Sequence, residues 1–303
     1  MKISIIGAGA LGKTYGGLLA LSGQDVNFLM HSEYPQIKEA GCFYLNFSET
    51  QERCTVQAPH SYNHALELPP SDLIVISLKT TENDKLSSLL SACLTEKSVI
   101  LIIQNGIGNE EFISRLTGDC PIICAISSMG ASRSDAVNVQ VSYAGALKLA
   151  PFRSNAIMAC SQIQNLFGNL PVSIPIKIYE HYKELRWHKL AWNVPFGALS
   201  IIFDKTTDVL SKDEPYLTIV RHLISEITDI ARSEGVTFQN LNPQDWISFT
   251  QKTQGYYPSI YRDLKEGKAL EKEYIFDNVL KIAKKNNIVA PYLSLCTQFL
   301  NFI

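Results

Sequence analysis

The chain has 303 residues, which exceeds one ordinary hydrophobic core and suits two domains. Apolar residues make up 46% of it and charged residues 18%, the proportions of a globular protein, and no window reaches the roughly 18 uncharged apolar residues that a membrane span requires. The formal net charge of −2 argues against general binding to nucleic acids or to anionic membranes, because both partners favour a basic face.

Seven cysteines are scattered along the chain without a CxxC pair. The closest two, Cys120 and Cys124, have no histidine at the spacing of a zinc site, so no metal is expected. Reduced, buried thiols in a cytoplasmic protein are the simplest interpretation. The amino terminus does not have the pattern of a signal peptide, because its short apolar run enters a glycine-rich turn.

The first half of the chain alternates short β-rich runs with helical stretches. Strands are expected at residues 2–6, 25–30, 72–78, 98–103 and 122–125, with a helix at 10–22. The runs at 72–78 and 98–103 are continuously apolar, as strands covered on both faces require. This alternation predicts a parallel sheet with helical crossovers. Residues 137–149 alternate polar with apolar and predict antiparallel strands appended to the same sheet.

The second half has a helical periodicity from Tyr179 onward. Long helices are expected at 179–203, 216–234 and 270–286, separated by Gly235, Pro243 and Pro258. We therefore expect an α/β domain at residues 1–177 and an all-α domain at residues 178–303.

A glycine-rich turn follows the first strand and opens the first helix. The segment is Gly7-Ala8-Gly9-Ala10-Leu11-Gly12. In this context the pattern is the dinucleotide-binding fingerprint of a Rossmann domain. The first glycine permits the tight turn, the second admits the pyrophosphate and the third lets helix and strand pack closely. The diphosphate is expected at the positive end of the helix.

The end of the second strand bears on the choice of dinucleotide. An acidic residue there would accept the ribose hydroxyls of NAD. That place holds Met30-His31-Ser32, and Glu33 comes slightly later. His31 and Ser32 can donate hydrogen bonds to a 2′-phosphate, so the sequence favours NADP(H), although no arginine lies in this segment.

Two polar segments follow buried strands, at the carboxyl edge where open α/β sheets bind ligands. Lys79 can reach a phosphate or a substrate carboxylate, or it can simply begin a solvated loop. Asn105, in the turn Gln104-Asn105-Gly106, can place an amide beside the nicotinamide. Asn-Gly is also a favoured turn pair without any functional role.

A lysine lies among apolar residues in the segment LRWHKLAWN. Lys189 and Asn193 are four residues apart and share one helix face. A partly desolvated lysine can serve as a general acid, which the reduction of a ketone needs for the nascent alkoxide. The alternative is a lysine whose stem packs on the surface while its ammonium reaches water. His188 points about 100° away around the helix and is interpreted as structural.

A further segment, Ser259-Ile260-Tyr261-Arg262-Asp263, precedes a predicted helix that carries Glu271. A hydroxyl for a substrate carboxylate and a carboxylate for a substrate hydroxyl are plausible roles. Ordinary helix capping by Ser259 and a solvated Glu271 are the alternatives.

Together these motifs resemble the ketopantoate reductase (2-dehydropantoate 2-reductase) family, in the family's order from Met1 to about Asn287. The resemblance implies a fold like that of 6-phosphogluconate dehydrogenase, with Lys189 as general acid and Glu271 positioning substrate and lysine. It also implies that Asn193 and Ser259 hold the two ends of the substrate, and that Asn105 lies near the nicotinamide. The implied cofactor-binding residues are Gly7, Ala8, Gly9, Ala10, Leu11, Gly12, His31, Ser32, Lys79, Asn105 and Glu271.

The chain departs from the family pattern at four positions. His31 replaces the arginine that usually ends the second strand, and Glu82 replaces a frequent glutamine. Gly197 and Tyr256 stand where asparagines often hold the substrate. Each lost amide removes hydrogen bonds worth roughly 1 kcal/mol.

The leading hypothesis is an NADPH-dependent reductase of a small 2-oxo acid, with ketopantoate first. Another 2-oxo or 2-hydroxy acid is the second candidate, and a dinucleotide-binding sensor without catalysis is the third. A homodimer is compatible with a helical second domain.

Overall fold

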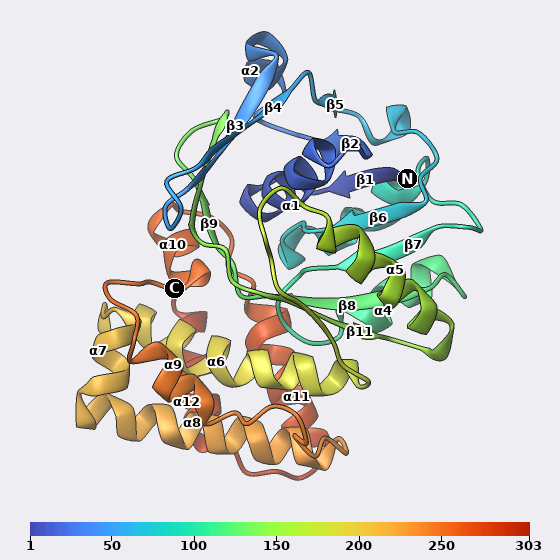
Figure 1. The fold of residues 1–303 in the computed structure, drawn as a ribbon. Helices are drawn as coiled ribbons and strands as arrows, with labels where there is room; N and C mark the ends of the chain where they lie inside the picture. Colours follow the sequence, from blue (N-terminus) through green and yellow to red (C-terminus); the bar gives the residue numbers. More distant parts are fainter. The chain divides into compact units, whose positions relative to one another are not determined.

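The computed structural model describes residues 1–303 and divides into two compact units (Figure 1). The first, which we call the sheet unit, comprises Met1–Gln104 and Glu110–Tyr182. The second, the helical unit, comprises Asn105–Asn109 and Lys183–Ile303. A five-residue excursion from the first half of the chain thus packs with the helices of the second half.

The sheet unit is built on an eight-stranded sheet. In spatial order its strands are β12 (Ile176–Ile178), β11 (Leu147–Pro151), β8 (Ile122–Ser127), β7 (Val99–Ile102), β6 (Leu73–Ile76), β1 (Lys2–Ile6), β2 (Asp25–Leu29) and β5 (His60–Tyr62). Every neighbouring pair is parallel except β8 and β11. The predicted parallel sheet is confirmed, and the β-branched runs of β6 and β7 lie at its centre.

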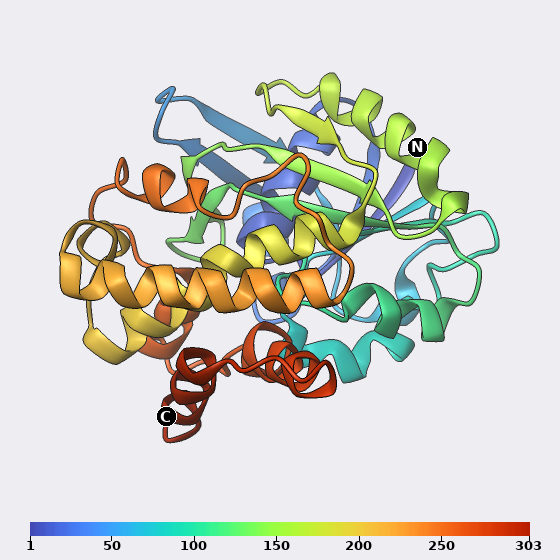
Figure 2. The same ribbon diagram turned by 90° about the horizontal axis from the view of Figure 1, so that it is seen from below.

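Helices cover both faces of this sheet. Alternate residues of β6 face different apolar clusters: Leu73 and Val75 join α1 (Ala10–Leu21) and α5 (Ile157–Gly168), whereas Ile74 and Ile76 join α3 (Leu86–Leu90) and α4 (Asn109–Thr117). Figure 2 shows α5 and the α3–α4 region on opposite sides of the strands. The remaining short elements are α2 (Tyr34–Ala40) and the 3₁₀ turns η1 (Ala65–Glu67), η2 (Thr80–Lys85) and η3 (Ser154–Ala156).

A second, four-stranded sheet packs on the outer side of α1. Its order is β4 (Arg53–Gln57), β3 (Cys42–Phe47), β10 (Asn138–Tyr143) and β9 (Gly130–Arg133). The expectation for residues 137–149 is therefore only half right: β11 joins the main sheet, whereas β10 pairs with β3 and β9. The cause is α1, which has apolar residues on more than one side. Val139 and Val141 of β10 cover it in one continuous core with Tyr15.

The helical unit contains only helices and loops, as predicted. They are α6 (Tyr182–Phe203), α7 (Thr207–Lys212), α8 (Glu214–Ser233), α9 (Asp245–Thr250), α10 (Ser259–Lys265), the π-turn η4 (Glu273–Asp277), α11 (Asn278–Lys285) and α12 (Pro291–Asn301). The helix expected at 270–286 is interrupted by that π-turn, a feature frequent at functional sites. Buried residues of α6, α8 and α11 form one apolar core.

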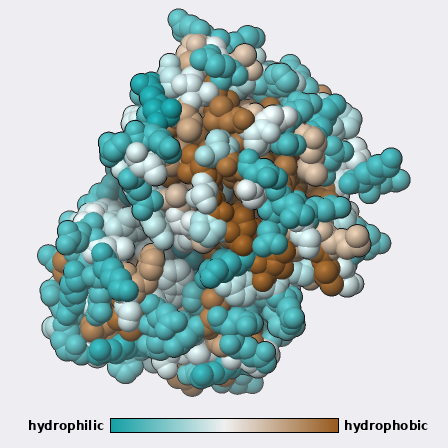
Figure 3. All heavy atoms as spheres, in the orientation of Figure 1, coloured by the Kyte–Doolittle hydropathy of each residue, from teal (hydrophilic) through white to brown (hydrophobic).

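The surface agrees with the balanced composition. Figure 3 shows hydrophilic side chains over most of one face, with apolar side chains gathered in its upper part, on the sheet unit. None of the helices combines the length and the apolar run that crossing a bilayer requires.

Candidate functional site

The glycine-rich turn adopts the tight geometry that its sequence predicts. Gly7 has φ +93°, and a Cβ there would lie 2.5 Å from the backbone nitrogen of Leu78. A Cβ on Gly12 would lie 2.4 Å from the carbonyl oxygen of Gly7 and 2.6 Å from the hydroxyl of Ser77. That hydroxyl donates a 2.8 Å hydrogen bond to the Gly7 carbonyl. Both glycines are therefore required by the packing of β1, α1 and the end of β6.

Gly9 is different, because a Cβ built on it meets no atom within 4 Å. It is the N-cap of α1, where no side chain caps the helix and no acidic residue occupies the first turn. Open space beside uncapped backbone N–H groups at the positive end of a helix fits a diphosphate. The residues present thus fit a dinucleotide at this turn.

The end of β2 differs in one respect from the sequence-based expectation. His31 and Ser32 are exposed, as donors to a ligand should be. Glu33, however, is held by two cations: Lys13 of α1, 2.5 Å away, and Arg133 of β9. The sequence contains no arginine near this strand, and the fold supplies one from residue 133.

The loop after β6 is fixed to the end of β7. The Gln104 side-chain nitrogen donates to the Leu78 carbonyl at 2.9 Å and to the Asn83 side-chain oxygen at 2.7 Å. Lys79, half-buried, immediately precedes η2. Glu82, the residue that departs from the family pattern, forms an ion pair with Lys85. Both loops at this edge of the sheet are thereby ordered.

Asn105 belongs to the helical unit, and its turn is tied to η4. Gly106 has φ +88°, and a Cβ there would lie 2.5 Å from the carbonyl oxygen of Tyr274. The Ile107 backbone N–H donates to that same carbonyl at 2.9 Å, and the Asn109 side chain donates to the Asn105 carbonyl at 2.9 Å. Close backbone packing thus requires the glycine of this pair, and Asn-Gly is in addition a pair favoured in turns.

The structure brings together two of the predicted site residues. The Asn193 side-chain nitrogen of α6 lies 3.3 Å from the Asn105 side-chain oxygen, in hydrogen-bond contact. Asn193 is buried, and Asn105 is half-buried. An amide pair of this kind orients each partner and leaves further donors and acceptors for a ligand.

Lys189, one turn before Asn193, lies against two indole rings. Its ammonium is 4.8 Å from the ring centroid of Trp192 and 5.5 Å from that of Trp246. Both rings are buried, and aromatic faces attract a cation more strongly where water is scarce. The Lys189 side chain is half-buried. His188 packs on Trp246 with 4.8 Å between ring centroids.

The remaining predicted residues occupy defined places in the same unit. Ser259 is the first residue of α10 and is half-buried, and Asp263, one turn later, is buried. Glu271 lies two residues before η4 and is only 3% exposed. A carboxylate so deeply buried is not the solvated helix charge considered as an alternative.

Gly197 reflects close packing of two helices. A Cβ at this position of α6 would lie 3.1 Å from Ile260 of α10. Tyr256 lies beside Trp192, with 6.2 Å between ring centroids. At these two departures from the family pattern, the chain has a close helix contact and an aromatic pair instead of amides.

Sequence reasoning missed Trp246, Lys13 and Arg133. Trp246 reaches Lys189 from α9, more than fifty residues along the chain, and no local pattern connects them. Lys13 lies in α1, four residues after Gly9, and no local pattern links it to Glu33 or to Arg133. Its side chain is fully buried.

Comparison with known proteins is consistent along the whole chain. The model of the family "Ketopantoate reductase PanE/ApbA" matches residues 3–154, and that of its C-terminal domain matches residues 181–303. The 2-dehydropantoate 2-reductase of Nostoc sp. is 29% identical over 100% of this chain and 95% of its own length. That of Pyrococcus abyssi is 26% identical over 96% of this chain and 94% of its own.

Solved structures show the same fold. The crystal structure of 2-dehydropantoate 2-reductase from Geobacter metallireducens has a TM-score of 0.93 at 28% identity and covers 99% of both chains. A ternary structure of D-mandelate dehydrogenase with NADH and anilino(oxo)acetate has a TM-score of 0.89 at 22% identity, covering 99% of this chain and 97% of its own. Because the two family models together match residues 3–154 and 181–303, the chain belongs to the ketopantoate reductase family of oxidoreductases.

Proposed function

We propose that the protein reduces a small 2-oxo acid, 2-dehydropantoate first, with NADPH as the hydride donor and Lys189 as the general acid. The observation that supports this most is the Lys189 ammonium lying on the faces of Trp192 and Trp246, one helical turn from the Asn193–Asn105 pair. A cation held by aromatic faces keeps its proton until a stronger base appears, and a nascent alkoxide is such a base.

In this proposal the dinucleotide belongs to the domain at residues 1–177 and the substrate contacts to residues 178–303, with Asn105 joining the latter. When bound, NADPH supplies a hydride to the ketone carbon. Gly7 to Gly12 hold the diphosphate, and His31, Ser32 and Lys79 offer donors to the other phosphate and ribose groups. Open space at Gly9 and the uncapped start of α1 support this assignment.

The chain's own residues then handle the proton and the orientation of the substrate. Lys189 Nζ transfers a proton to the ketone oxygen as the alkoxide forms. Glu271 positions the lysine and the substrate hydroxyl, and its burial at 3% exposure restricts the directions available to it. Asn193 donates to the hydroxyl end and Ser259 to the carboxylate, from separate helices.

The proposal is tested by dinucleotide oxidation with a panel of 2-oxo acids, using NADPH and NADH in parallel. The expected result is turnover of 2-dehydropantoate with a preference for NADPH. Oxidation of neither dinucleotide with any acid, while both still bind, would indicate a sensor instead.

The second candidate substrate is a different 2-oxo acid, and the packing around Gly197 supports this alternative. The close approach of Ile260, and the aromatic pair Tyr256–Trp192, put apolar surface where family members often carry asparagines. The solved D-mandelate dehydrogenase has the same fold, so that fold is compatible with aromatic substrates. In the panel, a higher kcat/KM for an aromatic or branched acid than for 2-dehydropantoate would establish this alternative.

The proposal also includes that the protein is a homodimer and is located in the cytoplasm. Support for the first comes from a solved family member with the same fold, the ketopantoate reductase of Staphylococcus aureus, which is described as dimeric. Sedimentation at micromolar concentration would measure the state of this chain directly.

A further inference from the structure

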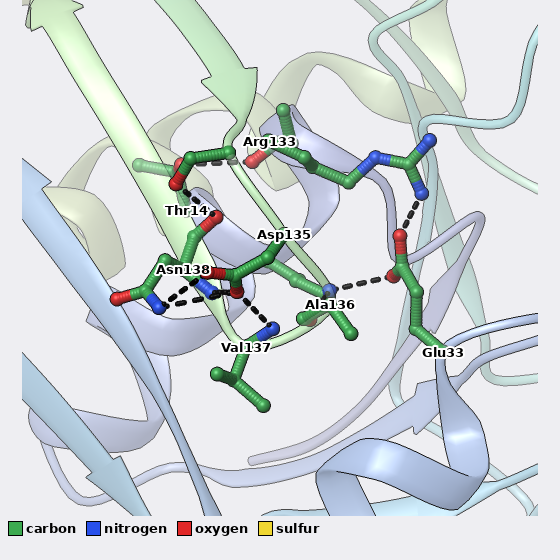
Figure 4. Close-up of polar contacts among 10 residues, drawn as sticks. Thr14, Glu33, Arg133, Asp135, Ala136, Val137 and Asn138 are labelled. Carbon is green, nitrogen blue, oxygen red and sulfur yellow. Dashed lines mark hydrogen bonds and ion pairs between the residues drawn. The ribbon is translucent and has the colours of Figure 1, made fainter.

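Three charged side chains meet just beyond the end of β2. Lys13 comes from α1, Glu33 from the N-cap of α2 and Arg133 from the end of β9. One carboxylate oxygen of Glu33 contacts the Arg133 guanidinium, and the other lies 2.5 Å from Lys13 Nζ. Figure 4 shows the Arg133 side chain extending away from its strand toward Glu33. We call these three residues the Glu33 cluster.

The hairpin that carries Arg133 is held firmly. Asp135 accepts hydrogen bonds from the backbone N–H groups of Val137 and Asn138 at 2.9 and 2.8 Å, and from the Asn138 side chain (Figure 4). These bonds lower the pKa of Asp135, the Asn138 side chain most of all. Its carboxylate is therefore engaged by its own turn. Lys13 Nζ also donates to the Ala136 carbonyl at 2.6 Å, which fastens the hairpin to α1.

The cluster lies where a Rossmann domain receives the adenosine ribose. Lys13 is one turn after Gly9, and Glu33 follows the last residue of β2 by four positions. The Ala8 backbone N–H donates to the Leu29 carbonyl at 3.3 Å, so the glycine turn and the end of β2 are adjacent. In such domains the group after the second strand decides between a 2′-hydroxyl and a 2′-phosphate.

The contacts of Glu33 decide how the cluster can act. An acid that selects NADH must offer its oxygens to the ribose hydroxyls, but both oxygens of Glu33 already meet a cation. Lys13 is fully buried, whereas the Arg133 side chain is 34% exposed. Arg133 contacts Glu33 through one nitrogen, and a guanidinium carries five N–H donors in a fork that matches phosphate.

We propose that Arg133 is the residue that selects a 2′-phosphate over a 2′-hydroxyl. Lys13 neutralises the charge of Glu33, so the positive charge of Arg133 is not cancelled and can attract the phosphate. This inference rests on the dinucleotide site of the proposed function. Arg133, which lies on a distant hairpin, then takes the role of the arginine that family members usually carry at the position of His31. Glu33 acts as a positioning residue, because its contact with the guanidinium holds Arg133 at the end of β2.

The test is the binding of two fragments, adenosine 2′,5′-bisphosphate and adenosine 5′-monophosphate, measured by calorimetry on the full chain. Arg133→Met is expected to weaken the bisphosphate by about 10- to 100-fold and the monophosphate by less than about threefold. Arg153→Met, at another exposed arginine of the sheet unit, is the matched control and should change neither.

Equal weakening of both fragments by Arg133→Met would mean a structural role and would overturn the proposal, as would no change in either. Thermal unfolding of each variant confirms that it is folded, and Arg133→Lys, which keeps the charge, should retain part of the preference. If the unmodified protein binds neither fragment, the dinucleotide site itself is wrong and the inference fails with it. If it binds both and Arg133→Met shows no selective loss, only the inference fails.

A second pair of variants tests the role of Lys13. Lys13→Met leaves Glu33 with Arg133 as its sole counter-ion and is expected to lower the preference for the bisphosphate by about tenfold. Adding Glu33→Gln removes the uncompensated carboxylate and should restore most of that preference. A double variant no better than Lys13→Met would contradict the neutralising role.

Discussion

At the scale of single residues, the glycines of the first turn are under different physical constraints. Gly12 is enclosed by the Gly7 carbonyl and Ser77, so any side chain displaces backbone. Gly9 faces open space. The packing agrees with the different roles that the sequence pattern assigns to the glycines: a side chain at Gly7 or Gly12 would meet backbone atoms, whereas one at Gly9 would meet none.

We expect Gly9→Ala to leave the free energy of unfolding within about 0.5 kcal/mol of the original, because the new methyl group meets nothing and the unfolded chain loses freedom. Dinucleotide affinity should nevertheless fall by about tenfold or more, because that methyl group occupies the space of the diphosphate. Urea unfolding and calorimetric titration with NADPH measure the two effects.

Gly12→Ala is the matched comparison. Its methyl group would clash with the Gly7 carbonyl at 2.4 Å, so a cost of about 1–3 kcal/mol in stability is expected besides weaker binding. Equal stabilities of the two variants would contradict the distinction drawn between these glycines.

Lys13 makes a separate prediction about pH. Burial, and next the Arg133 charge, lower its pKa from 10.5 to about 8, while Asp135 acts in the opposite direction. Between these two values the unfolded chain binds one proton more than the folded chain at this residue. The contribution of Lys13 to the free energy of unfolding should therefore increase as the pH rises through that window.

The contribution of Lys13 is isolated by comparing the original protein with Lys13→Met in urea at neutral pH and at about pH 10. The stability difference should move in favour of the original protein at the higher pH. A difference independent of pH would show that Lys13 keeps its ordinary pKa despite its burial and its contact with Glu33.

At the scale of elements, the Asn105 turn shows how the helical unit orders a segment that is distant in sequence. Gly106 and Ile107 pack on the Tyr274 carbonyl of η4, and Asn105 meets Asn193 of α6. The π-turn therefore does more than interrupt a helix: its carbonyl accepts a bond from the segment that carries a candidate site residue.

Gly106→Ala should cost about 2–4 kcal/mol in stability, because φ of +88° is strained for alanine and the Cβ would lie 2.5 Å from the Tyr274 oxygen. A shifted Asn105 should also lower kcat/KM. Gly168→Ala, at the end of α5 with no atom within 4 Å of its Cβ, is the control and should be neutral or slightly stabilising. Comparable losses in both variants would contradict the requirement for glycine at position 106.

At the scale of the whole molecule, the sequence alone predicts most of the architecture and less of the site. The apolar β-branched runs and the helical periodicity predict a parallel sheet followed by helices, because burial on both faces and the 3.6-residue period leave direct marks on a sequence. The second sheet was missed, because β3 and β10 pair across more than ninety residues and no local pattern connects the two strands.

Candidate site residues could be assigned from the sequence where they belong to a local motif. The glycine turn, Asn105 and the Lys189–Asn193 pair each carry a signal within a few residues. Trp246 beside Lys189 and Arg133 beside Glu33 do not, because each contact arises only from the packing of elements far apart in the chain. Long-range contacts of this kind determine the charge and the orientation of candidate site residues. The sequence therefore predicts the cofactor and the substrate less well than it predicts the fold.

The central claim is that Lys189 supplies the proton in a dinucleotide-dependent reduction. The most direct measurement is kcat for 2-dehydropantoate with NADPH, compared between the original protein and Lys189→Ala, together with the Kd for NADPH of each. We expect kcat to fall by about 10²- to 10⁴-fold while the Kd for NADPH stays within about twofold, because the lysine acts on the substrate and not on the dinucleotide. Unchanged kcat in Lys189→Ala would contradict the account.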